Sequence, residues 1–163
     1  MNRKPRTDEE LRQATDLLYY EIWMFQSLVQ GMASGIAGES VIHNALLESF
    51  GIHVRGLMWF FYADSPRKDD VIAEDFFPSS DTWQVARPKK TAVLEEAKSR
   101  ADKEIAHLTY ARLKVSPEQK PWEFLPIHDD LNKAIERFLS LVADDLLGQR
   151  WEEFKQGRPR PTL

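Results

Sequence analysis

Residues 40–62 read SVIHNALLESFGIHVRGLMWFFY, a stretch whose apolar residues recur at the spacing of a helix. Seven of them fall on one broad arc when the stretch is placed on a helix: Leu46, Leu47, Phe50, Val54, Leu57, Met58 and Phe61. Ile52 and Trp59 add apolar surface on the opposite side, and such a helix is normally surrounded by others. Its polar residues between His43 and Arg55 are too many for a membrane span. We therefore expect the central helix of a bundle here.

The composition is that of a globular protein, and we expect a single helical domain over residues 1–163. The net charge of −4 gives no global reason to expect nucleic-acid binding, so such a site must come from local clustering of charge. The absence of cysteine excludes disulfides, thiolate catalysis and cysteine-ligated zinc. The first ten residues, MNRKPRTDEE, lack the apolar run of a signal peptide, and we expect a cytoplasmic protein without a membrane partner.

Capping signals and apolar periodicity divide the chain into helices and connections. Long helices are predicted over four ranges: 7–30, 40–62, 91–113 and 126–155. Thr7 and Glu10 form a capping box, and Ser40 and Thr91 are N-cap candidates for two further helices. No stretch shows a convincing strand pattern. The expected fold class is therefore all-α, a bundle of about four long helices with a loose basic tail over 157–163.

The segment 65–90 carries three prolines and little helical periodicity. We expect a long, partly irregular connection between the helices over 40–62 and 91–113. A short helix over 70–76 is equally compatible with the sequence. Its aromatic residues Phe76, Phe77 and Trp83 are expected to pack as an apolar plug against the bundle. Connections of this length are often functional.

Chemically reactive side chains concentrate on the helix predicted over 91–113. Arg100 and His107 are seven residues apart, so on an α-helix they lie on nearly the same side, about 10 Å apart along the axis. Imidazole can transfer protons near neutral pH, while guanidinium binds phosphate and stabilises its developing negative charge. The pair therefore suits phosphodiester chemistry. The structural alternative is an exposed Arg100–Glu104 ion pair beside a histidine at the core boundary.

Three segments carry a family resemblance: NALLESF at 44–50, HVR at 53–55 and KEIAHLT at 103–109. They resemble prokaryotic helical proteins of the HEPN superfamily and its abortive-infection relatives. The resemblance implies an α-helical bundle that commonly dimerises. Ribonuclease members carry arginine, four to six residues, then histidine, with two copies facing each other across the dimer cleft. By this resemblance Arg100 would bind phosphate, and His107 would be the acid–base residue of metal-independent RNA cleavage without a cofactor.

The resemblance leaves open whether the chain is catalytic. Ala101 follows Arg100, where those ribonucleases usually have a polar residue, and many members of the superfamily are non-catalytic. The leading hypothesis is an RNA-directed module, with endoribonuclease activity in a defence or toxin–antitoxin system as its specific form. The expected partners are then RNA, a second copy of the chain and a cognate antitoxin. The alternative is a non-catalytic helical interaction protein in which Arg100 and His107 buttress a subunit contact.

Other polar residues are candidates for supporting a bound ligand: Lys103, Glu104, Tyr110, Glu48, His53 and Arg55. For Glu48 and Arg55, an ionic network that joins the helices over 40–62 and 91–113 is the preferred interpretation, because buried charges must be paired. A basic strip for an RNA backbone would combine two groups of cations: Arg87, Lys89 and Lys90, and Lys98, Arg100 and Lys103.

A metal site is the remaining alternative. Residues 104–107 form a Glu-x-x-His motif, which helical metalloproteins use to face a bundle core. Glu21 and Glu48 could add carboxylates, and His43 or His53 an imidazole. The chain has no second Glu-x-x-His motif for a di-iron site and no His-Glu-x-x-His, so the alternative is a mononuclear metal-binding helical bundle, and we expect no metal in the lead interpretation.

Overall fold

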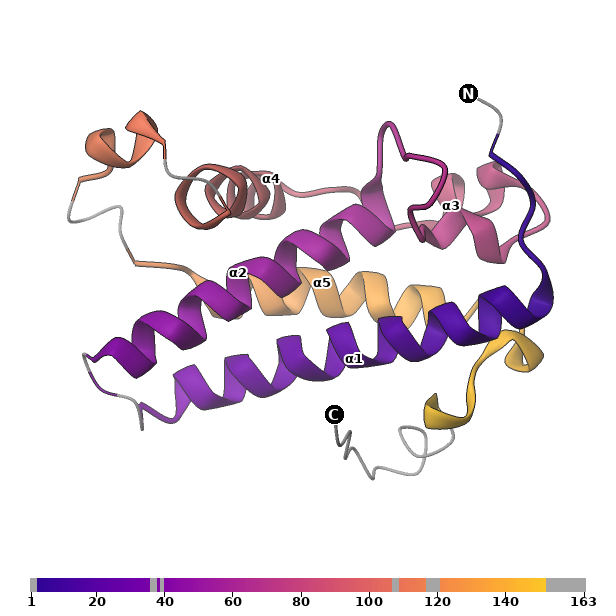
Figure 1. The fold of residues 1–163 in the computed structure, drawn as a ribbon, viewed down its shortest axis with the longest axis horizontal. Coiled ribbons are helices and arrows are strands. Elements are labelled where there is room, and N and C mark those ends of the chain that lie inside the picture. The colour runs from indigo at the N-terminus through magenta and orange to yellow at the C-terminus, as the bar shows by residue number, and fades with distance from the viewer. Residues whose placement is uncertain (1–2, 36–37, 39, 107–108, 117–120, 152–163) are drawn as a thin grey trace.

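The computed structural model describes residues 3–35, 38, 40–106, 109–116 and 121–151. Within these residues the chain is helical and has no strand, which confirms the all-α fold class. The α-helices follow one another as α1 (Asp8–Ala33), α2 (Val41–Tyr62), α3 (Ser80–Ala86), α4 (Ala92–Arg100) and α5 (Phe124–Leu139) (Figure 1). None of the helices in these ranges is long and apolar enough to cross a membrane.

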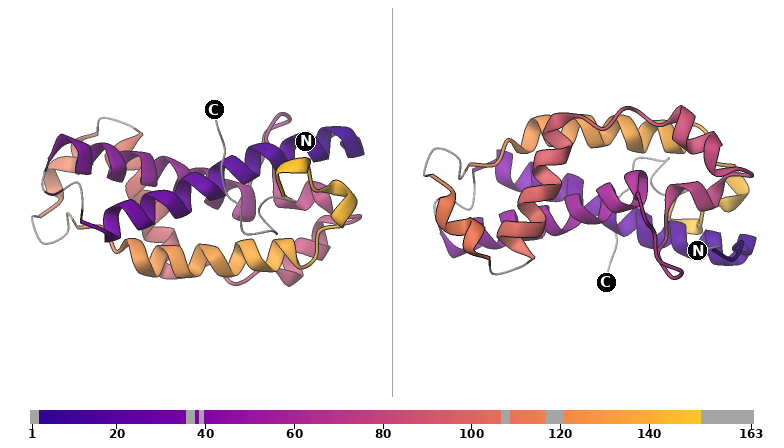
Figure 2. Two further views of the ribbon diagram at one scale, coloured as in Figure 1. Left: turned by 90° about the horizontal axis from the view of Figure 1, so that it is seen from below. Right: turned by 90° about the horizontal axis from the view of Figure 1, so that it is seen from above.

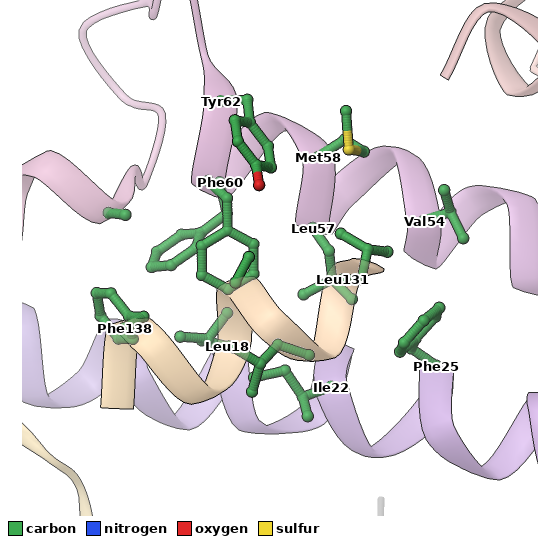
Figure 3. Packing of buried hydrophobic residues seen from close by; sticks show 14 of the residues in the cluster. Leu18, Ile22, Phe25, Val54, Leu57, Met58, Phe60, Tyr62, Leu131 and Phe138 are labelled. Carbon is green, nitrogen blue, oxygen red and sulfur yellow. The ribbon is translucent and has the colours of Figure 1, made fainter. Parts of the chain in front are cut away.

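The three longest helices, α1, α2 and α5, lie side by side along the long axis of the molecule and enclose the core (Figures 1 and 2). Figure 3 shows Ile22 of α1, Leu57 of α2 and Leu131 of α5 meeting there. The apolar arc predicted for the central helix is confirmed, because Phe50, Val54, Leu57, Met58 and Phe61 are all buried and Leu46 and Leu47 are partly buried against them. α2 is thus in contact with every other long helix.

The helix α4 runs across this layer instead of along it, from α5 to α2 (Figure 2). At the α5 end, the Thr91 hydroxyl donates to Asp130 Oδ2 at 2.7 Å. At the α2 end, the side chain of Ile105, which follows α4, occupies the space that a Cβ on Gly51 would need, so it packs against α2 where that helix has no side chain. The described residues therefore form three long helices with α4 lying across them, and the predicted bundle of about four long helices is not confirmed.

The single helix predicted over 91–113 is wrong beyond residue 105. α4 ends at Arg100 and is followed by a π-helical turn, η2 (Ala101–Ile105), and later by a 3₁₀ turn, η3 (Tyr110–Lys114). The carbonyl of Lys103 accepts a hydrogen bond from the Thr109 hydroxyl at 2.7 Å, and the carbonyl of Glu104 accepts one from Arg112. Side chains therefore satisfy the carbonyls that amides of the next helical turn would otherwise bind.

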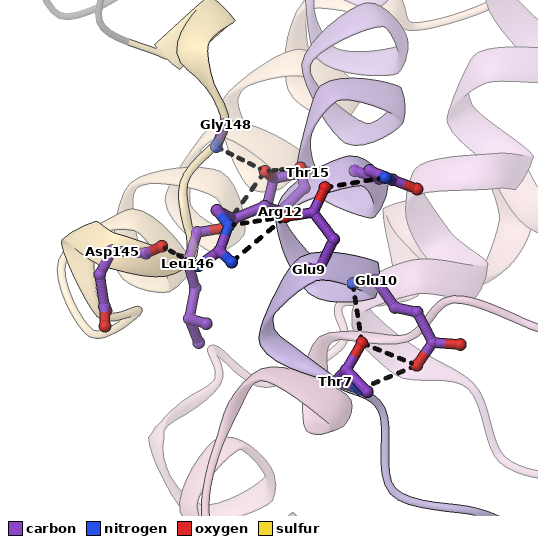
Figure 4. A network of polar contacts seen from close by, with 9 residues as sticks. Thr7, Glu9, Glu10, Arg12, Thr15, Asp145, Leu146 and Gly148 are labelled. Atoms are coloured by element: carbon purple, nitrogen blue, oxygen red, sulfur yellow. Dashed lines mark hydrogen bonds and ion pairs between the residues drawn. The ribbon is translucent and has the colours of Figure 1, made fainter.

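The helix predicted over 126–155 ends earlier, at Leu139 of α5. The chain then turns back through η5 (Asp144–Leu146), and Trp151 packs against α1, where its ring meets Tyr19. Thr15 fixes this return: its hydroxyl accepts from the Gly148 amide at 2.9 Å, and its carbonyl accepts from Trp151 Nε1 at 2.9 Å. Figure 4 shows the contact between Thr15 and Gly148. The tail over 157–163 lies outside the described residues.

In the connection over 65–90, the short helix considered over 70–76 is a 3₁₀ turn, η1 (Ala73–Phe76), and the short helix α3 that follows has no counterpart in the sequence-based expectations. Ser79 caps α3 by accepting from the Asp81 amide. The apolar plug is confirmed, because Phe76 and Trp83 are buried and Phe77 stacks on Trp83. All three rings pack edge-on against Phe138 of α5.

Candidate functional site

Arg100, the predicted phosphate ligand, is held in a fixed orientation at the end of α4. Its Nε and Nη2 donate to the Glu104 carboxylate at 3.1–3.2 Å, and its Nη1 donates to the Pro121 carbonyl at 3.0 Å. The guanidinium also lies 4.6 Å from the centre of the Trp122 ring, a cation–π distance. The side chain is 15% exposed. The Arg100–Glu104 ion pair that the sequence offered as the structural alternative is confirmed, although it is mostly buried and not exposed, and the segment before α5 adds two contacts that the sequence did not reveal.

Arg100 forms part of the wall of a surface pocket of about 230 Å³, which we call the Arg100 pocket. Its lining comes from α4, the segment before α5 and the start of α5: Val93, Glu96, Ala97, Arg100, Pro121, Trp122, Glu123 and Ile127. Two carboxylates, Glu96 and Glu123, therefore share the wall with one guanidinium that Glu104 already neutralises. A phosphate bound at Arg100 would therefore meet the negative charge of these carboxylates and of Glu104.

The position of His107 lies outside the described residues, so its pairing with Arg100 stays a prediction. The segment that leads to it is described, and it is the π-helical turn η2. Such turns are uncommon and occur frequently at functional sites. A π-helical turn contains more residues than an α-helical turn, so the regular α-helical spacing that the sequence predicted does not hold across Ala101–Ile105.

Of the residues predicted to support a ligand, Glu104 contacts Arg100 directly. Lys103 is exposed, and Tyr110 on η3 is 87% exposed. Glu48 is exposed on the N-terminal half of α2 and makes no ion pair within the described part of the chain. These side chains do not gather around the Arg100 pocket, whose lining includes none of them.

His53 belongs to the packing between α1 and α2. It is 7% exposed, its Nδ1 lies 2.7 Å from Glu21 Oε2, and the Tyr20 ring meets it edge-on. A Cβ on Gly56 would lie 3.2 Å from the same Glu21 oxygen, so α2 leaves room for this carboxylate. His53 is thus a hydrogen-bonded interhelical residue, and nothing connects it to Arg100.

Arg55 joins α2 to the segment after α4 as the sequence predicted, but its side chain is half exposed, and Glu48 takes no part in this network within the described residues. Its Nε donates to Asp102 Oδ1 at 2.5 Å, and Lys98 Nζ donates to Asp102 Oδ2 at 3.1 Å. Burial raises the pKa of Asp102, but the hydrogen bonds from Arg55 and Lys98 outweigh it and hold the pKa below its ordinary value. The spacing of Lys98 and Asp102 is readable in the sequence, whereas the partnership with Arg55 across 47 residues is not.

The contacts of Asp102 with Lys98 and Arg55 lie on the opposite side of α4 from Arg100. Residues four apart share one side of a helix, so Lys98 and Asp102 line one side and Arg100 and Glu104 the other. The predicted basic strip is therefore divided. Its upstream part lies at the end of α2, where the Arg87 guanidinium is 5.4 Å from the centre of the Tyr62 ring and donates to the Phe61 carbonyl at 3.2 Å.

The described residues contain no group of three or more histidine, aspartate or glutamate side chains placed to hold a metal ion. Within the Glu-x-x-His motif, the Glu104 carboxylate is bound to Arg100, and Glu21 is bound to His53.

Comparison with protein-family models, with curated proteins and with solved structures finds no match for this chain.

Proposed function

We propose that this protein is an RNA-directed helical module of the HEPN kind that acts in the cytoplasm. The observation that carries the proposal is the setting of Arg100: a guanidinium oriented by Glu104 and Trp122 in the wall of a surface pocket, on the helix that leads toward His107. An oriented arginine is suited to phosphate because its donors are arranged before the ligand arrives.

In its specific form the proposal is metal-independent RNA cleavage. The 2′-oxygen attacks the adjacent phosphorus while its proton passes to the imidazole of His107. The bond from phosphorus to the 5′-oxygen breaks, and that oxygen takes up a proton, which leaves a 2′,3′-cyclic phosphate and a 5′-hydroxyl. Arg100 would exchange the Glu104 carboxylate for the phosphate and stabilise the charge that develops on its oxygens.

A second candidate is a non-catalytic interaction module. It is favoured by the negative charge around Arg100, because Glu96 and Glu123 line the same pocket and Glu104 is bound directly. In that case Arg100 serves as a brace that ties the end of α4 to residues 121–122.

Cleavage of a labelled single-stranded RNA by the wild type, His107→Ala and Glu104→Gln separates the two candidates. For a nuclease, we expect His107→Ala to lower the rate by about 100-fold or more with unchanged stability to urea. Glu104→Gln should bind RNA more tightly, because it releases Arg100. For a brace, the wild type leaves RNA intact, and Arg100→Ala lowers stability to urea. Absence of cleavage and of RNA binding by the wild type would overturn the proposal.

We also infer a homodimer and a cognate antitoxin as partners, because the proposed family places two copies of the site across one cleft. A solution mass of 19.0 kDa, that of one chain, at micromolar concentration would contradict the dimer.

A further inference from the structure

A second pocket, of about 330 Å³, lies between α2 and α4, and we call it the α2–α4 pocket. Its lining contains three cations and one carboxylate: Arg55, Gly56, Trp59, Arg67, Asp70 and Lys98. It shares no residue with the Arg100 pocket, and Lys98 reaches it from the opposite side of α4. The pocket was not predicted, because its residues come from three segments that only the folded chain brings together.

Asp102 orients the cations of α2 and α4 but leaves some of their N–H donors unbound. Asp102 binds Arg55 through Nε alone and Lys98 through one N–H, so a single carboxylate orients two positive charges. The terminal Nη groups of Arg55 make no hydrogen bond within the described part of the chain. Because the pKa of Asp102 lies below its ordinary value, this carboxylate stays ionised and keeps both cations in place at neutral pH.

The third cation, Arg67, comes from a connection that is anchored by its backbone. The Arg67 amide donates to Asp70 Oδ2 at 2.7 Å, and Trp59 Nε1 donates to the same oxygen at 3.0 Å. Arg3 binds the carbonyls of Arg67 and Asp70 from the other side. The Arg67 guanidinium itself forms no ion pair or hydrogen bond with any residue in 3–35, 38, 40–106, 109–116 or 121–151.

The charges in and beside the pocket leave a positive excess. Arg55, Arg67 and Lys98 carry three positive charges, and Asp70 and Asp102 carry two negative ones. Each of the three cations keeps donors that the protein does not bind. Guanidinium groups present paired N–H donors that match phosphate oxygens, and their contacts with a phosphate are charge-assisted hydrogen bonds.

A second cationic pocket lies further along α2. It has a volume of about 380 Å³ and is lined by Tyr62, Gln84, Arg87, Pro88, Lys89 and Lys90. Arg55 and Tyr62, one lining residue from each pocket, are seven residues apart on α2, so these two residues lie on nearly the same side of the helix and about 10 Å apart along its axis. Two cationic pockets in line fit a ligand with successive phosphates better than one isolated phosphate.

We propose that the α2–α4 pocket binds a backbone phosphate of a single RNA strand. This inference rests on the proposed function and deepens it, since it separates the place where RNA is held from the place where Arg100 and His107 would act. Trp59 offers an aromatic surface beside the phosphate, a combination found in proteins that bind single strands.

The test is fluorescence anisotropy of a labelled single-stranded oligoribonucleotide with the wild type, Arg67→Ala and the matched control Lys68→Ala. Both variants lose one positive charge from adjacent exposed residues, but only Arg67 lines the pocket. We expect Arg67→Ala to weaken binding about tenfold and to lower the salt dependence of log K by about one, with Lys68→Ala changing binding less than twofold. Competition by adenosine monophosphate should be weak compared with competition by the unlabelled oligonucleotide.

Equal binding by the wild type and Arg67→Ala would overturn this inference and leave the proposed function standing. Competition by adenosine monophosphate as strong as that by the oligonucleotide would also overturn it, in favour of a nucleotide ligand. Failure of the wild type to bind the oligonucleotide would overturn the proposed function as well. Urea unfolding of both variants serves as the folding control, because the Arg67 and Lys68 backbones, and not their side chains, anchor the connection.

Discussion

At the scale of single residues, Thr15 is the polar group on which the closure of the fold depends. Its side chain is fully buried, and its hydroxyl donates to the Arg12 carbonyl at 2.7 Å while accepting from the Gly148 amide at 2.9 Å. A buried amide that loses its acceptor costs more free energy than the hydrogen bond contributes in the native state. Thr15 therefore has a larger effect on stability than its size suggests.

Replacement of Thr15 by valine keeps the shape of the side chain and removes the acceptor of the Gly148 amide. We expect Thr15→Val to lower the free energy of unfolding by about 1–3 kcal/mol, measured by urea denaturation. The control Thr15→Ser keeps the hydroxyl and loses one methyl group, at a cost of about 1 kcal/mol. A Thr15→Val variant as stable as the wild type would show that the Gly148 amide finds another partner.

Nothing in the sequence around Thr15 marks this role. The core stripe of the first helix is readable from its spacing, and Leu11, Leu18 and Ile22 are indeed buried. The partners of Thr15, Gly148 and Trp151, lie more than a hundred residues further along the chain, at 133 and 136 positions. Local patterns hold no information about such pairs, whereas the Arg100–Glu104 pair is a helical neighbour and was predicted.

At the scale of the elements, the capped starts of α1, α2 and α4 were predictable, whereas the ends of the helices predicted over 91–113 and 126–155 were not. Thr7, Ser40 and Thr91 each accept the hydrogen bond expected of an N-cap, because the capping side chain and the amide that it binds lie three residues apart. The break after Ile105 involves Thr109 and Arg112, and the end of α5 at Leu139 precedes the return of the chain to α1. Apolar spacing continues through both breaks, so periodicity alone extends these helices too far.

The two threonine N-caps, Thr7 and Thr91, allow the free-energy contribution of the hydrogen bond between α4 and α5 to be estimated by comparison. Thr7→Ala removes a capping box at the exposed start of α1, and we expect a loss of about 1 kcal/mol of unfolding free energy. Thr91→Ala removes both the cap of α4 and the hydrogen bond to Asp130, and we expect a loss of about 2 kcal/mol. Urea unfolding measures both, and equal losses would mean that the α4–α5 hydrogen bond contributes nothing.

At the scale of the whole molecule, α4 ties two of the long helices together through ionised carboxylates. Asp102 joins α4 and η2 to Arg55 of α2, and Asp130 of α5 joins Thr91. Hydrogen bonds from Lys133 and Thr91 lower the pKa of Asp130, against the effect of burial, and the pKa of Asp102 is lowered as well. The interhelical arrangement is therefore sensitive to acid.

Both carboxylates have folded-state pKa values below the ordinary value of 3.8, so they bind protons less readily in the folded than in the unfolded state. Their stabilisation is fully present above 3.8 and is lost as the pH falls through the lower folded-state values. We expect urea unfolding to show a steep loss of stability in that range. The double variant Asp102→Asn, Asp130→Asn should have a lower free energy of unfolding at pH 7, and that free energy should fall less on acidification than in the wild type. An equal fall in both proteins would contradict the assignment of the acid sensitivity to these two carboxylates.

The late contacts of Thr15 also bear on how the protein is made. Trp151, whose side chain covers Tyr19 and Thr15 of α1, leaves the ribosome 136 residues after Thr15. At about 5–20 residues per second, this part of the first helix waits on the order of ten seconds for its cover. The surface of α1 around Tyr19 therefore stays without this cover through most of translation, although α2 can already pack on the rest of α1, and a holdase chaperone would find its target there.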